Sequence, residues 1–96
     1  MIRKLIYRQP AVNMLLKLKR QNRTQHIQVI RARALSLQAH AEEQMSVKQT
    51  QTDPNIYETF ISAVELNDMI PPEGYRLLFL LTSKHIVLLT IYEDHR

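Results

Sequence analysis

Two arginines near the ends of the C-terminal segment could together hold an anion. Residues 74–96 contain two apolar stretches joined by the polar residues 82–85, which is typical of a β-hairpin, and Arg76 and Arg96 lie at its two ends. In an antiparallel hairpin the start of the first strand lies beside the end of the second. We therefore expect Arg76 and Arg96 to lie close together in space and to form an anion site.

Each of these residues also has a purely structural interpretation. Arg76 could form an ordinary surface ion pair, Arg96 could be frayed at the end of the strand, and His95 could be a solvent-exposed histidine beside Asp94. The acids that could pair with Arg76 across the sheet are Glu58, Glu65 and Asp94.

Basic residues are concentrated in the first half of the chain. Residues 1–48 contain ten Lys and Arg against two acids, whereas residues 49–96 contain three against seven. This asymmetry points to an anionic partner, with nucleic acid the first candidate, although a solvated helix face would look similar. The candidate nucleic-acid-binding residues are Lys17, Lys19, Arg20, Arg23, Arg31 and Arg33.

Length and composition narrow the classes of protein to consider. The chain of 96 residues suits a single domain, residues 1–96, with one modest core. It has no cysteine and its four histidines are scattered, so we expect no metal site and no cofactor. The apolar runs are too short for a membrane span, and the N-terminus lacks a secretory signal. We expect a cytoplasmic protein with no membrane contact.

The N-terminal half predicts a strand followed by two helices. Residues 1–8 alternate weakly and are followed by Pro10, which suits the first turn of a helix. Apolar residues then recur at helical spacing on either side of the polar segment 19–25, which we interpret as the break in a helical hairpin. Thr24 or Asn22 is the expected N-cap of the second helix, and a single bent helix is the alternative.

The C-terminal half predicts strands. Residues 42–55 are polar and aperiodic and are expected to form a loop, and residues 56–66 favour a strand, with a short helix at 63–67 as the alternative. A turn at 71–74 contains the only glycine and leads into the hairpin. The predicted fold class is α+β: an N-terminal strand, a two-helix hairpin, then three antiparallel strands forming one sheet with the helices on one face.

The first strand of the hairpin is apolar on both sides. Leu77, Phe79 and Leu81 point one way, and Leu78 and Leu80 point the other. Two helices cannot cover both faces, so we expect loops, a partner segment or a second subunit to cover the second one.

This pattern resembles the RelE/ParE toxin superfamily. The specific part of the resemblance is Gly74-Tyr75-Arg76-Leu77-Leu78-Phe79 together with His95-Arg96, which is similar to the C-terminal hairpin of the mRNA-cleaving RelE branch. The N-terminal half is similar only in pattern, through Pro10-Ala11 and the spacing of Ile27 and Ile30.

The resemblance implies the toxin of a type II toxin–antitoxin system, a ribosome-dependent mRNA endoribonuclease that inhibits translation. In such an enzyme the 2′-hydroxyl of the mRNA attacks the neighbouring phosphate, which requires fixed positive charge and proton transfer. Arg76 and Arg96 would supply the charge, and His95 would transfer a proton. The basic helical residues would contact ribosomal RNA, and a cognate antitoxin protein would cover the apolar sheet face.

The chain also departs from the RelE pattern. Residues 57–69 contain no lysine or arginine, where that branch has catalytic lysines, and instead carry Glu58, Glu65 and Asp68. The tyrosine of the branch's C-terminal extension has no counterpart after Arg96. These departures favour a non-enzymatic binder on the same fold, either a ParE-like gyrase inhibitor or a catalytically degenerate RelE-fold protein-binding module. A third hypothesis, based on the basic N-terminal helices, is a nucleic-acid-binding accessory module.

Overall fold

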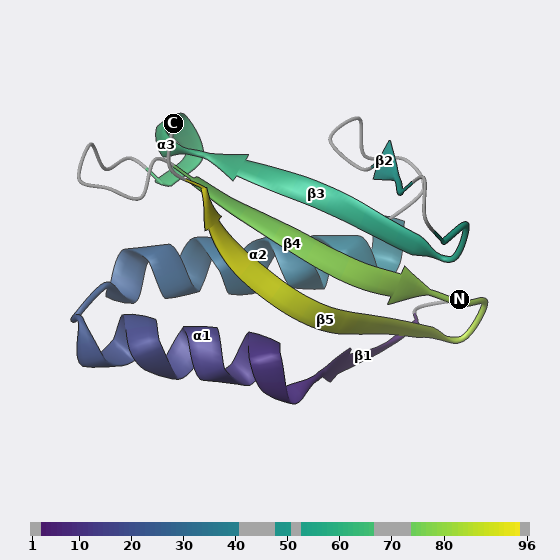
Figure 1. Cartoon of the computed structure of the whole chain (residues 1–96), viewed down its shortest axis with the longest axis horizontal. Helices are drawn as coiled ribbons and strands as arrows, with labels where there is room; N and C mark the ends of the chain where they lie inside the picture. Colours follow the sequence, from purple (N-terminus) through teal and green to yellow (C-terminus); the bar gives the residue numbers. More distant parts are fainter. Residues whose placement is uncertain (1–2, 41–47, 51–52, 67–73, 95–96) are drawn as a thin grey trace.

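The chain folds into a helical hairpin packed on one face of a mixed sheet (Figure 1). The computed structural model describes residues 3–40, 48–50, 53–66 and 74–94. Its elements are β1 (Lys4–Tyr7), α1 (Gln9–Arg20), α2 (Thr24–His40), β2 (Lys48–Gln49), β3 (Ile56–Ser62), α3 (Ala63–Leu66), β4 (Gly74–Leu81) and β5 (His85–Asp94). The predicted α+β class is confirmed, with two additions to the element order, β2 and α3.

The helical hairpin is broken within the predicted polar segment. Asn22 adopts a left-handed conformation with φ of 58°, and the Arg23 amide donates to the Leu18 carbonyl while the Asn22 amide donates to that of Lys19. These are the two bonds of a Schellman motif, which ends α1. The Arg23 carbonyl accepts the first bond of α2, from Ile27. Arg23 is therefore the N-cap of α2, and the prediction of Thr24 or Asn22 was wrong.

The sheet has the strand order β1-β5-β4-β3-β2 over the described residues. Strands β3, β4 and β5 are antiparallel neighbours, as predicted. The N-terminal strand β1, whose place in the sheet the sequence did not indicate, pairs in parallel with β5, from Lys4 opposite His85 to Tyr7 opposite Leu88. The sheet is therefore mixed: β1 runs parallel to β5, and the other paired strands are antiparallel.

Two short elements, β2 and α3, differ from the preferred prediction. Residues 48–49, inside the predicted loop, form β2 against β3. The strand expected at 56–66 ends at Ser62, where α3 begins, so the short-helix alternative was the better one there. Ser62 and Glu65 explain the change, because the Ser62 amide donates to Glu65 Oε2 at 2.9 Å and the Glu65 amide to Ser62 Oγ at 3.4 Å. This is a capping box, a recognised helix start.

The core lies between the sheet and the two helices. Leu77 and Phe79 of β4 are fully buried beside Ile86 and Leu88 of β5, and Leu18, Ile30 and Leu37 from the helices pack against this cluster. Leu78 pairs with Thr90 but Phe79 pairs with Leu88, so Leu89 forms a bulge in β5. The bulge keeps Leu88 and Ile91 on the helix-facing side of the sheet although they are three residues apart.

Gly74 is required by the close approach of β3 to β4. A Cβ atom at this position would lie 2.4 Å from the Ile61 carbonyl oxygen and 2.9 Å from the ring of Phe60. The first distance is to backbone, so a side chain could enter only if the two strands separated. The only glycine of the chain thus stands at the first residue of β4, where β3 leaves no room for a side chain.

No helix in the described part of the chain is long and apolar enough to cross a membrane.

Candidate functional site

Arg76 lies on the sheet face that points away from the helices. Its neighbours in β4, Tyr75 and Leu77, are fully buried on the helix-facing side, whereas the Arg76 side chain is 52% exposed. In the sheet Arg76 is opposite Phe60 of β3 on one side and Tyr92 of β5 on the other. We call this side of the sheet the open face. It presents the guanidinium to solvent between two aromatic residues.

The pairing of β4 with β5 meets the first requirement of the predicted anion site. Gly74 pairs with Asp94, so the start of β4 lies beside the end of β5, as predicted. His95 and Arg96 follow Asp94 directly but lie outside the described residues, as does Asp68. Of the three predicted catalytic residues, Arg76 alone is therefore placed by the structure.

Glu58 is the acid that lies next to Arg76. Its Oε2 is 3.9 Å from Arg76 Nε, and both side chains are partly exposed. A pair this long and this exposed contributes only about 0–1 kcal/mol, so it holds the guanidinium loosely. Glu65, another acid considered for this role, instead pairs with Arg33. Asp94 lies on the open face opposite Gly74, so the surroundings of Arg76 carry two carboxylates.

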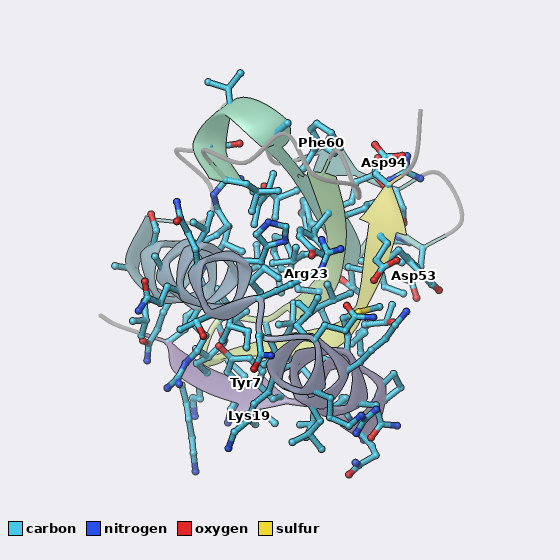
Figure 2. The ribbon with its side chains drawn as sticks, turned by 90° about the vertical axis from the view of Figure 1, so that its left-hand side faces the viewer. Tyr7, Lys19, Arg23, Asp53, Phe60 and Asp94 are labelled. Atoms are coloured by element: carbon cyan, nitrogen blue, oxygen red, sulfur yellow. The ribbon has the colours of Figure 1, made fainter. Side chains whose placement is uncertain are left out.

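The open face around Arg76 is otherwise largely apolar, with Thr90 its polar member in β5. Strand register places on it a set of partly exposed side chains, together with Tyr92, which is 53% exposed. The partly exposed members are Ile6, Ile56, Phe60, Leu78 and Leu80. Figure 2 shows Phe60 and Asp94 on the side of the molecule away from α1 and α2. The sequence-based expectation of a second apolar sheet face is confirmed for the described residues.

Two of the six predicted nucleic-acid-binding residues are engaged within the domain. Lys17 Nζ lies 3.3 Å from Glu93 Oε1 at the end of β5. Arg33 Nη1 donates to Thr59 Oγ1 at 2.7 Å and to the Phe60 carbonyl at 3.1 Å, and Nη2 pairs with Glu65. The Arg33 side chain is only 14% exposed. Its charge ties α2 to β3 and α3, which is a structural role.

The other four predicted residues lie in the last turn of α1, in the hairpin loop and in α2. Lys19, Arg20 and Arg31 are exposed, whereas Arg23 is partly buried and its Nη1 is a buried atom with no hydrogen-bond partner among the described residues. In Figure 2 Arg23 lies in the middle of the molecule, between the helices and the sheet. Lys19, Arg20 and Arg31 are therefore the members of this set that can reach an external phosphate. Lys19 and Arg20 also lie in the last turn of α1, where positive charge complements the helix dipole.

A buried His26–Tyr75 pair supports the strand that carries Arg76. His26 Nδ1 and the Tyr75 hydroxyl oxygen are 2.7 Å apart, the rings meet edge to face at 5.5 Å, and both residues are almost completely buried. Tyr75 belongs to the Gly-Tyr-Arg motif, but its partner is 49 residues away in the sequence. Nothing local in the sequence indicates this contact. It fixes the start of β4 against the first turns of α2.

We expect Tyr75→Phe to lower the free energy of unfolding by about 1–3 kcal/mol, because it leaves a buried imidazole nitrogen without this partner. Urea unfolding followed by circular dichroism would measure it. Tyr92→Phe is the matched control: it removes the same hydroxyl from a half-exposed ring on the open face, and we expect a change within about 0.5 kcal/mol. Equal effects of the two changes would show that the His26–Tyr75 contact contributes nothing to stability.

The described residues contain no group of three or more His, Cys, Asp or Glu placed to hold a metal ion. The site thus consists of one exposed arginine on an apolar sheet face, a basic helical hairpin behind it, and a buried polar pair between them.

Comparison of the chain with protein-family models, with curated proteins and with solved structures finds no match.

Proposed function

We propose that this protein is a RelE-like toxin of a type II toxin–antitoxin system that cleaves mRNA on the ribosome. The observation that carries the proposal is the position of Arg76: exposed on the open face, and beside the end of the strand that leads into His95 and Arg96. Together with the Gly-Tyr-Arg and His-Arg motifs, this position supports a phosphate site on the open face.

The proposed chemistry is attack of the mRNA 2′-hydroxyl on the adjacent phosphate. Arg76 and Arg96 stabilise the charge that develops on the phosphate oxygens, since a guanidinium can donate two hydrogen bonds to a phosphate. His95 transfers a proton to or from a reacting oxygen. The exposed basic residues of the helical hairpin contact the phosphates of ribosomal RNA, a contact that depends on salt and needs no base readout.

The proposed protein partner is a cognate antitoxin laid over the open face. Partly exposed apolar side chains line this face on strands β1, β3 and β4, and a helix or an extended segment of a partner would bury them. Such a segment would also cover Arg76 and so block access of mRNA to the phosphate site. One surface would then account for both activity and its inhibition.

One observation favours a second candidate, a non-enzymatic binder on the same fold. Glu58 lies 3.9 Å from Arg76, and Asp94 shares the open face, so two carboxylates would repel an RNA backbone there. A ParE-like gyrase inhibitor or a protein-binding module without catalysis tolerates these acids.

Induction of the chain in a bacterial host separates the candidates. We expect growth and translation to stop, and primer extension to reveal mRNA cut within ribosome-bound codons. Purified DNA gyrase should supercoil normally in its presence. Inhibited supercoiling with intact mRNA would instead assign the ParE-like function, and intact mRNA with normal supercoiling and growth would leave the protein-binding module and the nucleic-acid-binding accessory module.

A further inference from the structure

A pocket opens between the two helices, away from the open face. It has a volume of about 310 Å³, near the lower limit for small-molecule sites. Its walls come from the end of β1 and from facing sides of α1 and α2. The lining residues are Tyr7, Val12, Leu15, Leu16, Lys19, Ile27 and Arg31.

The lining combines an aliphatic floor with two cations. Val12, Leu15, Leu16 and Ile27 supply apolar side chains, while Lys19 and Arg31 bring a positive charge each from α1 and α2. Neither cation forms an ion pair with a described residue, and residues 1–41 contain no acid at all. The charge at this pocket is therefore positive and uncompensated by the helices that form it.

Tyr7 adds a neutral hydrogen-bond donor. Partial burial raises the pKa of the Tyr7 phenol above its ordinary value, although the nearby Arg31 guanidinium pulls it the other way. The phenol therefore stays protonated at neutral pH, and its hydroxyl can donate to an anion. Figure 2 shows Tyr7 and Lys19 on the same side of the helical hairpin.

The combination favours an amphipathic anion over the simplest ones. An inorganic phosphate or an RNA backbone would satisfy Lys19 and Arg31 but leave the aliphatic floor in contact with water. A purely apolar ligand would cover the floor but leave two cations partly desolvated without a counter-ion. A ligand with an apolar tail and one carboxylate satisfies both parts, because a guanidinium accepts a carboxylate in bidentate geometry.

We propose that this pocket binds an apolar-tailed monocarboxylate of the size of a medium-chain fatty acid, with its carboxylate between Lys19 and Arg31 and its tail along the α1–α2 floor. The size follows from the volume: at roughly 30 Å³ for each water-sized group, the pocket holds about ten non-hydrogen atoms. The proposal does not depend on the cleavage chemistry, since it uses neither Arg76 nor the open face; it shares only Lys19 and Arg31 with the proposed ribosomal RNA contact.

Decanoate, used below its micelle-forming concentration, is the probe for this site. Titration into the purified full chain, followed by NMR of methyl groups, should shift the signals of Leu15, Leu16 and Ile27 saturably. Arg31→Gln and Lys19→Gln should each weaken binding at least about tenfold through loss of a charged hydrogen bond. Lys84→Gln removes an exposed charge in the β4–β5 turn and is the matched control, with unchanged affinity expected.

Two further ligands and one further variant complete the test. Decyltrimethylammonium has the same tail with the opposite charge, and butyrate has the carboxylate with little tail; both should bind at least about tenfold more weakly than decanoate. Leu16 is already 46% exposed, so Leu16→Gln should lower the affinity for decanoate without unfolding the domain. Equal binding of the cationic ligand, or unchanged affinity in both charge variants, would overturn the proposal.

Discussion

Replacing Arg76 by alanine is expected to lower mRNA cleavage by the induced chain by about 100- to 1,000-fold, the usual effect of removing one group that stabilises developing negative charge. Arg76→Lys should recover only part of the activity, because an ammonium cannot donate two parallel hydrogen bonds to one phosphate. Primer extension on a reporter mRNA, compared at equal protein levels, measures the loss.

The fold of the Arg76 variants should be intact. The Arg76 side chain is half exposed and its pair with Glu58 is long. The free energy of unfolding should therefore change by no more than about 1 kcal/mol, as measured by thermal unfolding. Lys84→Ala, which removes an exposed charge from the β4–β5 turn, is the control that should keep full cleavage. If Arg76→Ala and Arg96→Ala both cut mRNA as well as the parent chain, the proposed mechanism is wrong.

Glu58 sharpens the choice between the two candidate functions. Under the nuclease proposal its carboxylate competes with the substrate phosphate for Arg76, so Glu58→Gln should maintain or increase cleavage. Under the binding-module alternative no RNA is cut by either form.

The second large effect that we expect concerns stability and distinguishes the two faces of β4. Leu77→Ala should lower the free energy of unfolding by roughly 3–5 kcal/mol, because it removes a fully buried side chain and leaves a cavity beneath the helices. For a domain of this size that loss corresponds to a fall in Tm of more than about 10 °C. Differential scanning calorimetry or urea unfolding measures it.

Leu78→Ala is the matched control for this measurement. The residue type is the same and the position is adjacent, but Leu78 points to the open face and is only partly buried. Its loss should cost less than about 1.5 kcal/mol. If the two variants are equally destabilised, the open face is covered in the free protein and is not available for an antitoxin. If an antitoxin does bind there, Leu78→Ala should weaken the complex more than Leu77→Ala does.

The parts of the fold that the sequence predicted well depend on local patterns. The helical spacing on either side of residues 19–25 predicted α1 and α2, and the two apolar stretches with a polar turn predicted the β4–β5 hairpin. Alternation within β4 also predicted that Leu78 and Leu80 share the face opposite to Leu77 and Phe79, and the structure places Arg76 on the face of Leu78. These features are set by neighbours along the chain, so they can be read without knowledge of the rest of the molecule.

The capping box at Ser62 and Glu65 was a local signal that could have been used. The pattern Ser-x-x-Glu stands in the sequence, yet the β-branched and aromatic residues around it suggested a continuous strand. Recognising it would have ended β3 at Ser62 and placed Glu65 away from Arg76.

Other features depended on contacts between distant segments. The parallel pairing of β1 with β5, the contact of His26 with Tyr75, and the bonds of Arg33 to β3 and α3 join residues 26 to 81 positions apart. The sequence led to the same prediction, nucleic-acid binding, for Arg33 and Lys17 as for Lys19 and Arg31. Charge alone does not reveal which cations have acidic or carbonyl partners in the folded chain. The pocket between α1 and α2 was likewise not predicted.

By itself, then, the amino-acid sequence determined the class of the fold, the hairpin, and the presence of an arginine on an apolar open face, since these follow from residue spacing and from alternation along single elements. Only the tertiary structure decided which charges remain available to a ligand. Burial and pairing depend on how the helices pack on the sheet. This packing bonds Arg33 to Thr59 within the domain and places Lys19 and Arg31 at one pocket.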